Sequence, residues 1–101
     1  MDSSLDPIEK AGRRLRAPYA FPFGGRNLVI ACLIRKADWR PLKAPGWRKK
    51  EAYIIGADMD GNFFLRHCDG SVRYWEHKAQ TDTMIAPSVR EFLSKLVETP
   101  L

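Results

Sequence analysis

The sequence contains little cysteine and no long apolar run, and both absences limit the class of protein. Only two cysteines, Cys32 and Cys68, occur in 101 residues. Two cysteines make no disulfide framework, so we expect free thiols, buried or partly buried, in a protein of the cytoplasm. The longest apolar run, Leu28 to Ile34, has seven residues, whereas a membrane span needs roughly 18. No basic stretch followed by an apolar one opens the chain, so neither a secretion signal nor a membrane partner is expected.

Motifs of catalysis and of metal binding are also absent from the sequence. There is no Gly-x-Ser-x-Gly, no Cys-x-x-Cys and no His-x-x-x-His, and Gly24-Gly25 lacks the Lys-Ser/Thr that follows a phosphate loop. His67, Cys68 and His77 are the only candidate ligands for a soft metal. Because neighbouring residues of a strand point to opposite faces, His67 and Cys68 are not expected to share one ion. We therefore predict no catalytic residue, no metal and no cofactor.

One string does resemble part of an enzyme. An apolar run leads into Asp58-Met59-Asp60-Gly61-Asn62, as in phosphatases of the haloacid-dehalogenase type, or as at the start of a calcium loop. Here another predicted strand comes directly after the string, and the glutamate that ends a calcium loop is missing. We expect an Asp-Gly turn in which Asp58 bonds to the local backbone.

Composition and charge describe an ordinary globular domain with a basic end. Hydrophobic residues make up 45%, charged residues 29% and aromatic residues 11%, which suits one domain, 1–101, with one core. Residues 1–50 hold twelve Lys/Arg and four Asp/Glu (+8), and residues 51–101 hold five and eight (−3), which together give the net +5. Electrostatic attraction of a partner should therefore come from the N-terminal half.

The N-terminal half reads as irregular, with two regular elements. Asp6-Pro7 predicts the start of a short helix over 7–16, with an apolar side and a basic side. Prolines and Gly24-Gly25 predict an extended loop over 17–27, whose aromatic side chains pack on the core. The apolar run 28–34 predicts a strand covered on both faces, although a short buried helix has the same pattern.

The C-terminal half has the clearer pattern. Asp60-Gly61 and Asp69-Gly70 separate three β-rich runs, which predicts an antiparallel meander with strands at about 52–57, 62–67 and 71–76. A Ser88-x-x-Glu91 capping box and apolar residues at helical spacing predict a C-terminal helix over 88–98 that covers the meander. The predicted class is α+β, with an additional strand near 28–34.

A Pro/Gly-rich loop is the candidate binding site. It combines two tryptophans with basic residues: Trp39, Arg40, Lys43, Trp47, Arg48, Lys49 and Lys50. Tryptophan and arginine dominate the binding energy of protein interfaces, and aromatic residues among basic ones also suit single-stranded nucleic acid. In a third alternative the tryptophans belong to the core and the cations are only solvated.

Short motifs in the C-terminal half, over about residues 52–97, resemble the SUKH superfamily, the SMI/KNR-type domains named after a yeast cell-wall regulator. The matching segments are Ile54 to Asp58, Gly61-Asn62, Gly70 to Val72, Tyr74 to His77 and Ile85 to Leu93. The resemblance implies an α+β fold without a catalytic centre and a SUKH-like core at about 28–98. It also implies a protein-binding role, since bacterial members are mostly immunity proteins that neutralise toxin domains.

The function expected from the sequence is therefore non-enzymatic protein binding. The partner would be a protein, with a toxin domain as the specific case that the resemblance implies. The alternative is a small basic nucleic-acid-associated protein. The sequence leaves open the oligomeric state and whether Trp39 and Trp47 lie on the surface or in the core.

Overall fold

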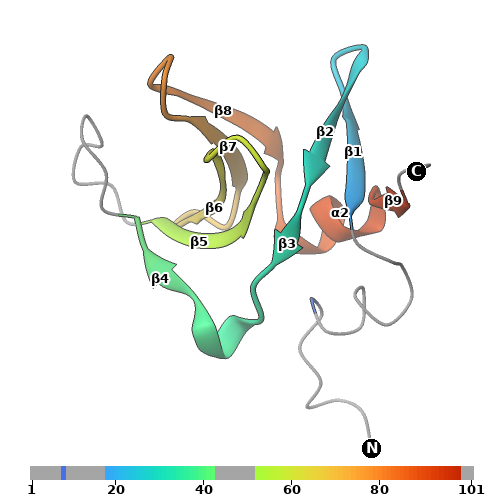
Figure 1. Ribbon diagram of the computed structural model, residues 1–101. Coiled ribbons are helices and arrows are strands. Elements are labelled where there is room, and N and C mark those ends of the chain that lie inside the picture. Colours follow the sequence, from blue (N-terminus) through green and yellow to red (C-terminus); the bar gives the residue numbers. More distant parts are fainter. Residues whose placement is uncertain (1–7, 9–17, 43–51, 99–101) are drawn as a thin grey trace, which may run out of the picture.

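A computed structural model describes Ile8 and residues 18–42 and 52–98, most of which form antiparallel β-sheets followed by a short α-helix near the C-terminus (Figure 1). The elements in chain order are strands β1 (Tyr19–Phe23), β2 (Arg26–Ile30) and β3 (Cys32–Leu33), the 3-10 turn η1 (Lys36–Asp38), strands β4 (Arg40–Pro41), β5 (Ala52–Ala57), β6 (Phe63–His67), β7 (Val72–Glu76) and β8 (Thr81–Ala86), helix α2 (Val89–Ser94) and strand β9 (Val97–Glu98).

The predicted meander is confirmed as β5, β6 and β7, which are antiparallel neighbours. Gly61 and Gly70 occupy the two turns with φ of +86° and +91°, a region that glycine enters without steric cost. The meander continues into β8, and β3 and β4 both pair with β5, so the sheet has the order β3-β5-β6-β7-β8 with β4 beside β3. Register shifts at Ile54/Gly56 and at Val72/Arg73 mark irregularities of the kind that bends strands. The meander accordingly curls in Figure 1.

A second, three-stranded sheet with the order β2-β1-β9 is not expected from the sequence. β1 and β2 form a hairpin over Gly24-Gly25, whose φ angles of +59° and +82° suit a two-residue hairpin turn. The expected loop over 17–27 is therefore wrong, although Tyr19 and Phe21 are buried as expected. Pro22 is tolerated in β1 because β9 pairs only with Tyr19 and Ala20, so at Pro22 the strand has a neighbour on one side only.

The apolar run 28–34 connects the two sheets. Its first part lies in β2, and Cys32–Leu33 forms β3 on the edge of β5 in the other sheet. The prediction of a strand is confirmed in part, because the run divides at Ala31, whose N–H donates to the Ala57 carbonyl at 2.8 Å. Gly56 is opposite Leu33, and a Cβ at position 56 would lie 2.9 Å from the Cys32 carbonyl oxygen. The close approach of β3 to β5 therefore requires glycine at this position.

The predicted C-terminal helix begins where the capping box places it but is shorter than expected. The Ser88 hydroxyl accepts the Glu91 N–H at 3.1 Å, and α2 ends at Ser94 rather than continuing to 98. The Lys95 and Leu96 N–H groups reach back to carbonyls only three residues earlier, which tightens the last turn. Val97 and Glu98 then pair with β1, because the edge of that strand is open to them.

The core lies between the two sheets and α2. Phe92 of α2 packs against Phe21 and Phe64, with ring centroids 5.2 and 5.8 Å apart, and Tyr74 is 5.0 Å from Phe64. Ile8 also belongs to this cluster, whereas the rest of the helix predicted over 7–16 lies outside the described residues. A smaller cluster of Leu42, Ala52, Leu65 and Trp75 packs on the other face of the meander.

Candidate partner-binding surface

The structure describes two of the seven predicted binding residues, Trp39 and Arg40. The other five, Lys43, Trp47, Arg48, Lys49 and Lys50, lie outside the described residues. The described chain reaches Leu42 and resumes at Ala52, where the Leu42 N–H donates to the Ala52 carbonyl at 3.1 Å. Leu42 and Ala52 are therefore neighbours at the end of the β4–β5 pair.

Trp39 is a half-buried anchor rather than an exposed contact residue. Its indole N–H donates to the Ile34 carbonyl at 2.7 Å, and its ring packs against the main core cluster. The preceding turn η1 is held by an ion pair between Arg35 and Asp38 at 2.7 Å. The Arg35 Nε–H donates a hydrogen bond to the Asp38 carboxylate, and this bond together with the charge of Arg35 lowers the pKa of Asp38. Trp39 thus fixes the path of the chain into β4.

Arg40 is exposed, in β4, and next to this anchor. One of its guanidinium nitrogens donates to the Trp39 carbonyl at 3.3 Å. In the sheet register Arg40 is opposite Ile54, and Pro41 is opposite Tyr53. The charged group therefore stands at the edge of the six-stranded sheet, close to the point where the 43–51 segment begins and ends.

Tyr53 and Arg66 extend this surface across the sheet. Tyr53 is 42% exposed although it lies in a strand between two neighbours. Pro41, Tyr53 and Arg66 are directly opposite one another on β4, β5 and β6, so their side chains share one face. We call these three residues, together with Arg40 at the same sheet edge but on the other face, the β4–β5 edge surface. Sequence reasoning missed Tyr53 and Arg66. Neighbouring strand residues alternate between faces, so the position of Tyr53 next to Ala52 was the one sequence signal that Tyr53 could be exposed.

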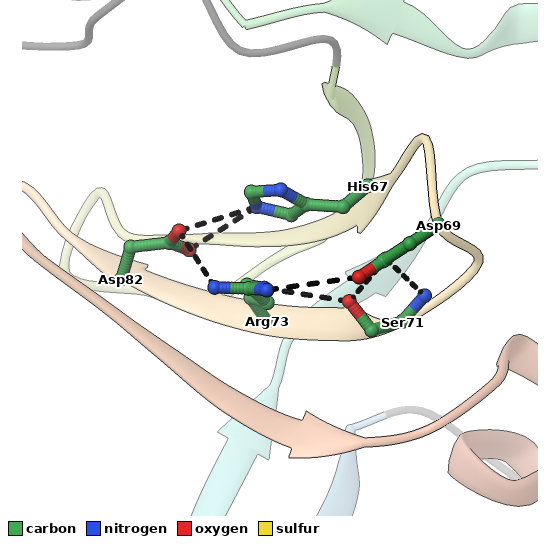
Figure 2. Close-up of polar contacts among 5 residues, drawn as sticks. All are labelled: His67, Asp69, Ser71, Arg73 and Asp82. Atoms are coloured by element: carbon green, nitrogen blue, oxygen red, sulfur yellow. Dashed lines mark hydrogen bonds and ion pairs between the residues drawn. The ribbon is translucent and has the colours of Figure 1, made fainter.

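A polar network includes His67, the neighbour of Arg66 on β6, whose side chain lies on the other face of the sheet (Figure 2). The buried His67 Nε2 is 3.3 Å from the Asp82 carboxylate, and the Arg73 guanidinium is 3.5 Å from it. Arg73 also approaches Asp69 at 3.8 Å, and its Nε donates to the Ser71 hydroxyl at 3.3 Å. The network joins β6, β7 and β8 around the β6–β7 turn.

The network holds serine, histidine and aspartate but has the geometry of a structural brace. The Ser71 hydroxyl donates to Asp69 at 2.6 Å and the Ser71 N–H donates to the same oxygen at 2.9 Å, whereas His67 is directed at Asp82. In a catalytic triad the serine hydroxyl would instead donate to the histidine. The bonds from Ser71, followed by the charges of Arg73 and His67, lower the pKa of the Asp69 carboxyl. Arg73 lies between the two carboxylates and offsets part of their charge.

The Asp58 string forms a hydrogen-bonded turn, as the sequence predicts. The Asp58 carboxylate accepts the N–H groups of Asp60 and Asn62 at 2.8 and 2.9 Å, the Asn62 amide at 3.0 Å and the Tyr74 hydroxyl at 2.5 Å. Burial raises the pKa of Asp58, but these hydrogen bonds together outweigh it and leave the pKa below its usual value. His77 braces the turn from outside, since its backbone N–H donates to the Asn62 side chain at 3.1 Å.

The candidate metal ligands and the two cysteines can be located in the described part of the chain. No group of three or more His, Cys, Asp or Glu side chains there could hold a metal ion. Cys32 and Cys68 are free thiols as expected, but both are exposed, so the expectation of burial is wrong. Cys68 is the first residue after β6, and Cys32 stands on the short edge strand β3, where neither side chain turns into a core.

Comparison with known proteins adds no relative. No family model, curated protein or solved structure matches the chain. Within the residues described, no helix is long and apolar enough to cross a membrane.

Proposed function

We propose that this chain is a non-enzymatic protein-binding module of the SUKH type, and that it binds its partner through the β4–β5 edge surface and the loop that begins and ends beside it. The bacterial role implied by the resemblance is that of an immunity protein that neutralises a toxin domain. The proposal of the family rests on the order of short motifs along the meander and into the α2 segment.

The observation that carries the binding role is the exposed Tyr53, which shares one face of the sheet with Pro41 and Arg66. A tyrosine that is 42% exposed in the middle of a sheet leaves apolar area in water that packing elsewhere would remove. Tyrosine and arginine are among the side chains that contribute most to binding free energy at protein interfaces. Tyrosine buries a large area with few rotatable bonds, and arginine offers several hydrogen-bond donors in a fixed geometry. Arg66 is half-buried on the same face as Tyr53. Arg40 is exposed at the adjacent sheet edge, but it is opposite Ile54, so its side chain lies on the other face. A partner that matches this surface presents carboxylates around an apolar site for the tyrosine ring.

The test is a paired set of variants on one purified partner. The double variant Arg40→Glu/Tyr53→Ser changes the proposed surface, and Arg90→Glu/Met59→Ser makes the same change of charge and a similar loss of apolar area at exposed positions elsewhere. The partner to try first is the toxin domain encoded next to this chain, if a large toxin-like gene precedes it. We expect the first variant to weaken binding in calorimetry by at least about tenfold and the control to leave it unchanged. Equal affinities of the two variants would contradict the proposed surface.

The immunity role has its own readout. Co-expression of the chain should restore growth of cells that produce the toxin domain, and the surface variant should not, while the control variant should. Tight binding without rescue would contradict the immunity role and leave the binding surface standing.

The second candidate is binding of single-stranded nucleic acid, which the net charge of +5 and the exposed Tyr53 favour. A base could stack on the tyrosine ring while arginines contact phosphates. Anisotropy with a labelled oligo-dT separates the two proposals, since nucleic-acid affinity falls steeply with salt, at a slope of roughly 0.7 per phosphate contacted. Absence of measurable binding at low salt excludes this candidate.

A further inference from the structure

Strand β8 forms the last edge of the six-stranded sheet. Within the residues that the structure describes, it pairs with β7 alone (Figure 1). Thr81, Thr83 and Met84 are exposed on it, Met84 to 51%. An edge strand presents a row of backbone donors and acceptors that another strand can pair with. Two of the devices that prevent such pairing, proline and lysine within the strand, do not occur between Thr81 and Ala86.

The exposed side chains of this edge are uncharged in a chain that is 29% charged. Asp82 is the only ionisable residue of β8. Its side chain is 10% exposed and lies beside Arg73 and His67 (Figure 2). The charge of Asp82 is therefore offset in part by Arg73 of its own chain, 3.5 Å away.

We propose that β8 pairs with β8 of a second copy of this chain, antiparallel and across a two-fold axis at Thr83. Residues directly opposite each other in antiparallel strands point to the same face of the sheet. A two-fold axis perpendicular to the sheet also keeps each residue on its own face. One residue of β8 must therefore be opposite the same residue of the other copy, and that residue marks the axis. An axis at Asp82 would place two carboxylates directly opposite each other, which is destabilising. An axis at Met84 would bring the irregular backbone near Ile85 of both copies next to the axis, where regular pairing is needed. At Thr83, two threonines meet, a favourable cross-strand pair, and Asp82 faces the partner's Met84.

A second copy fits this edge better than a foreign strand because of its charge. Pairing of this strand with its own copy brings no like charges together at its exposed positions, because Thr81, Thr83 and Met84 are all neutral. A strand selected to recognise a different chain is free to use complementary charges for specificity. The dimer interface uses the edge opposite to the β4–β5 edge surface, because β8 and β4 lie at the two ends of one sheet. Each dimer therefore presents two copies of that surface.

Sedimentation of the full chain tests the proposal. From about 10 µM to about 1 mM, the mass should rise from the monomer value of 11.6 kDa toward twice that value. Thr83→Lys places two like charges at the axis and should weaken self-association at least about tenfold. Thr83→Val, which is also β-branched, should retain it. Thr83 is exposed, and circular dichroism checks that both variants are folded.

A cysteine at the axis tests the register. In a Cys32→Ser/Cys68→Ser background, Thr83→Cys should form an intermolecular disulfide under mild oxidation, because residues opposite each other in antiparallel strands are about 4.5–5.5 Å apart at Cα. Ser94→Cys, exposed on α2, is the matched control and should not cross-link. A chain that is monomeric over the whole range, or equal association of the Lys and Val variants, overturns the proposal. So does a monomer whose β8 edge binds a foreign strand instead.

Discussion

Asp58 is the residue around which the β5–β6 turn is organised. Its carboxylate accepts four hydrogen bonds, one of them from Tyr74 on β7, so a turn of five residues is tied to a strand sixteen positions away. The same residues resemble a catalytic motif in sequence. Two features of the turn separate it from that motif: β6 pairs back onto β5 immediately after it, and its own hydrogen bonds occupy the carboxylate.

Tyr74 reports on this network through its titration. Burial, followed by the hydrogen bond to Asp58 and the charge of that carboxylate, raises the pKa of Tyr74 to about 12. An unfolded tyrosine titrates near about 10, so the raised pKa stabilises the fold fully below that pH, and this stabilisation is lost as the pH rises through about 12. We expect tyrosinate absorbance to show a late transition near about 12 and the urea midpoint to fall between about pH 10 and 12.

Tyr74→Phe provides the control for this pH dependence. The variant should lose the late absorbance transition and the alkaline decrease in stability that belongs to it. It should also be less stable at neutral pH by about 1–2 kcal/mol, because Asp58 loses a charge-assisted hydrogen bond. Tyr53→Phe, which removes an exposed hydroxyl, should change stability by less than about 0.5 kcal/mol. A late transition that persists in Tyr74→Phe would contradict the assignment.

At the scale of elements, α2 depends on its first residue. The helix has six residues, too few to be stable alone, and is held by the packing of Phe92 and Leu93 and by the Ser88 cap. Ser88→Ala should destabilise the protein by about 1 kcal/mol. Ser94→Ala, which removes an exposed hydroxyl bonded to the Glu91 carbonyl in the last turn, should have little effect. Equal losses in chemical denaturation would show that the cap contributes nothing specific.

The elements that were predictable from the sequence are those with a local chemical signal. Asp60-Gly61 and Asp69-Gly70 indicate tight turns, and Ser88 indicates a helix start. The turn before β8 carries no such signal, because Gln80 adopts a φ of +54° where a glycine would be expected. β9 exists only because β1 offers it an edge, and no property of Val97 or Glu98 encodes that contact.

The candidate site was predictable to a lesser degree than the fold. Composition alone makes Trp39 and Arg40 equal candidates for binding. In the structure they differ in solvent exposure, because the Trp39 indole is half-buried and hydrogen-bonded to Ile34 whereas Arg40 is exposed. Tyr53 and Arg66 became candidates through the register that aligns them across β4, β5 and β6. Register is set by pairing between distant segments, which one sequence does not specify.

At the scale of the whole molecule, the six-stranded sheet separates two proposed surfaces. The β4–β5 edge surface lies on β4, β5 and β6, β8 is at the other end of the strand order, and β7 lies between them. Sites without shared contacts are expected to behave additively. Thr83→Lys should therefore leave the affinity for a soluble partner unchanged, and Arg40→Glu/Tyr53→Ser should leave self-association unchanged.

The format of the assay then distinguishes a dimer with two independent surfaces from a monomer with one. On a surface densely coated with partner, a dimer engages two molecules and dissociates more slowly than its single-site affinity implies. Thr83→Lys should lose this avidity, measured as at least about tenfold faster dissociation from the dense surface, while calorimetry in solution gives the wild-type affinity. Thr83→Val should match the wild type in both assays. If Thr83→Lys also weakens the affinity in solution by the same factor, the two edges are energetically coupled. Additivity between the two surfaces would then be wrong.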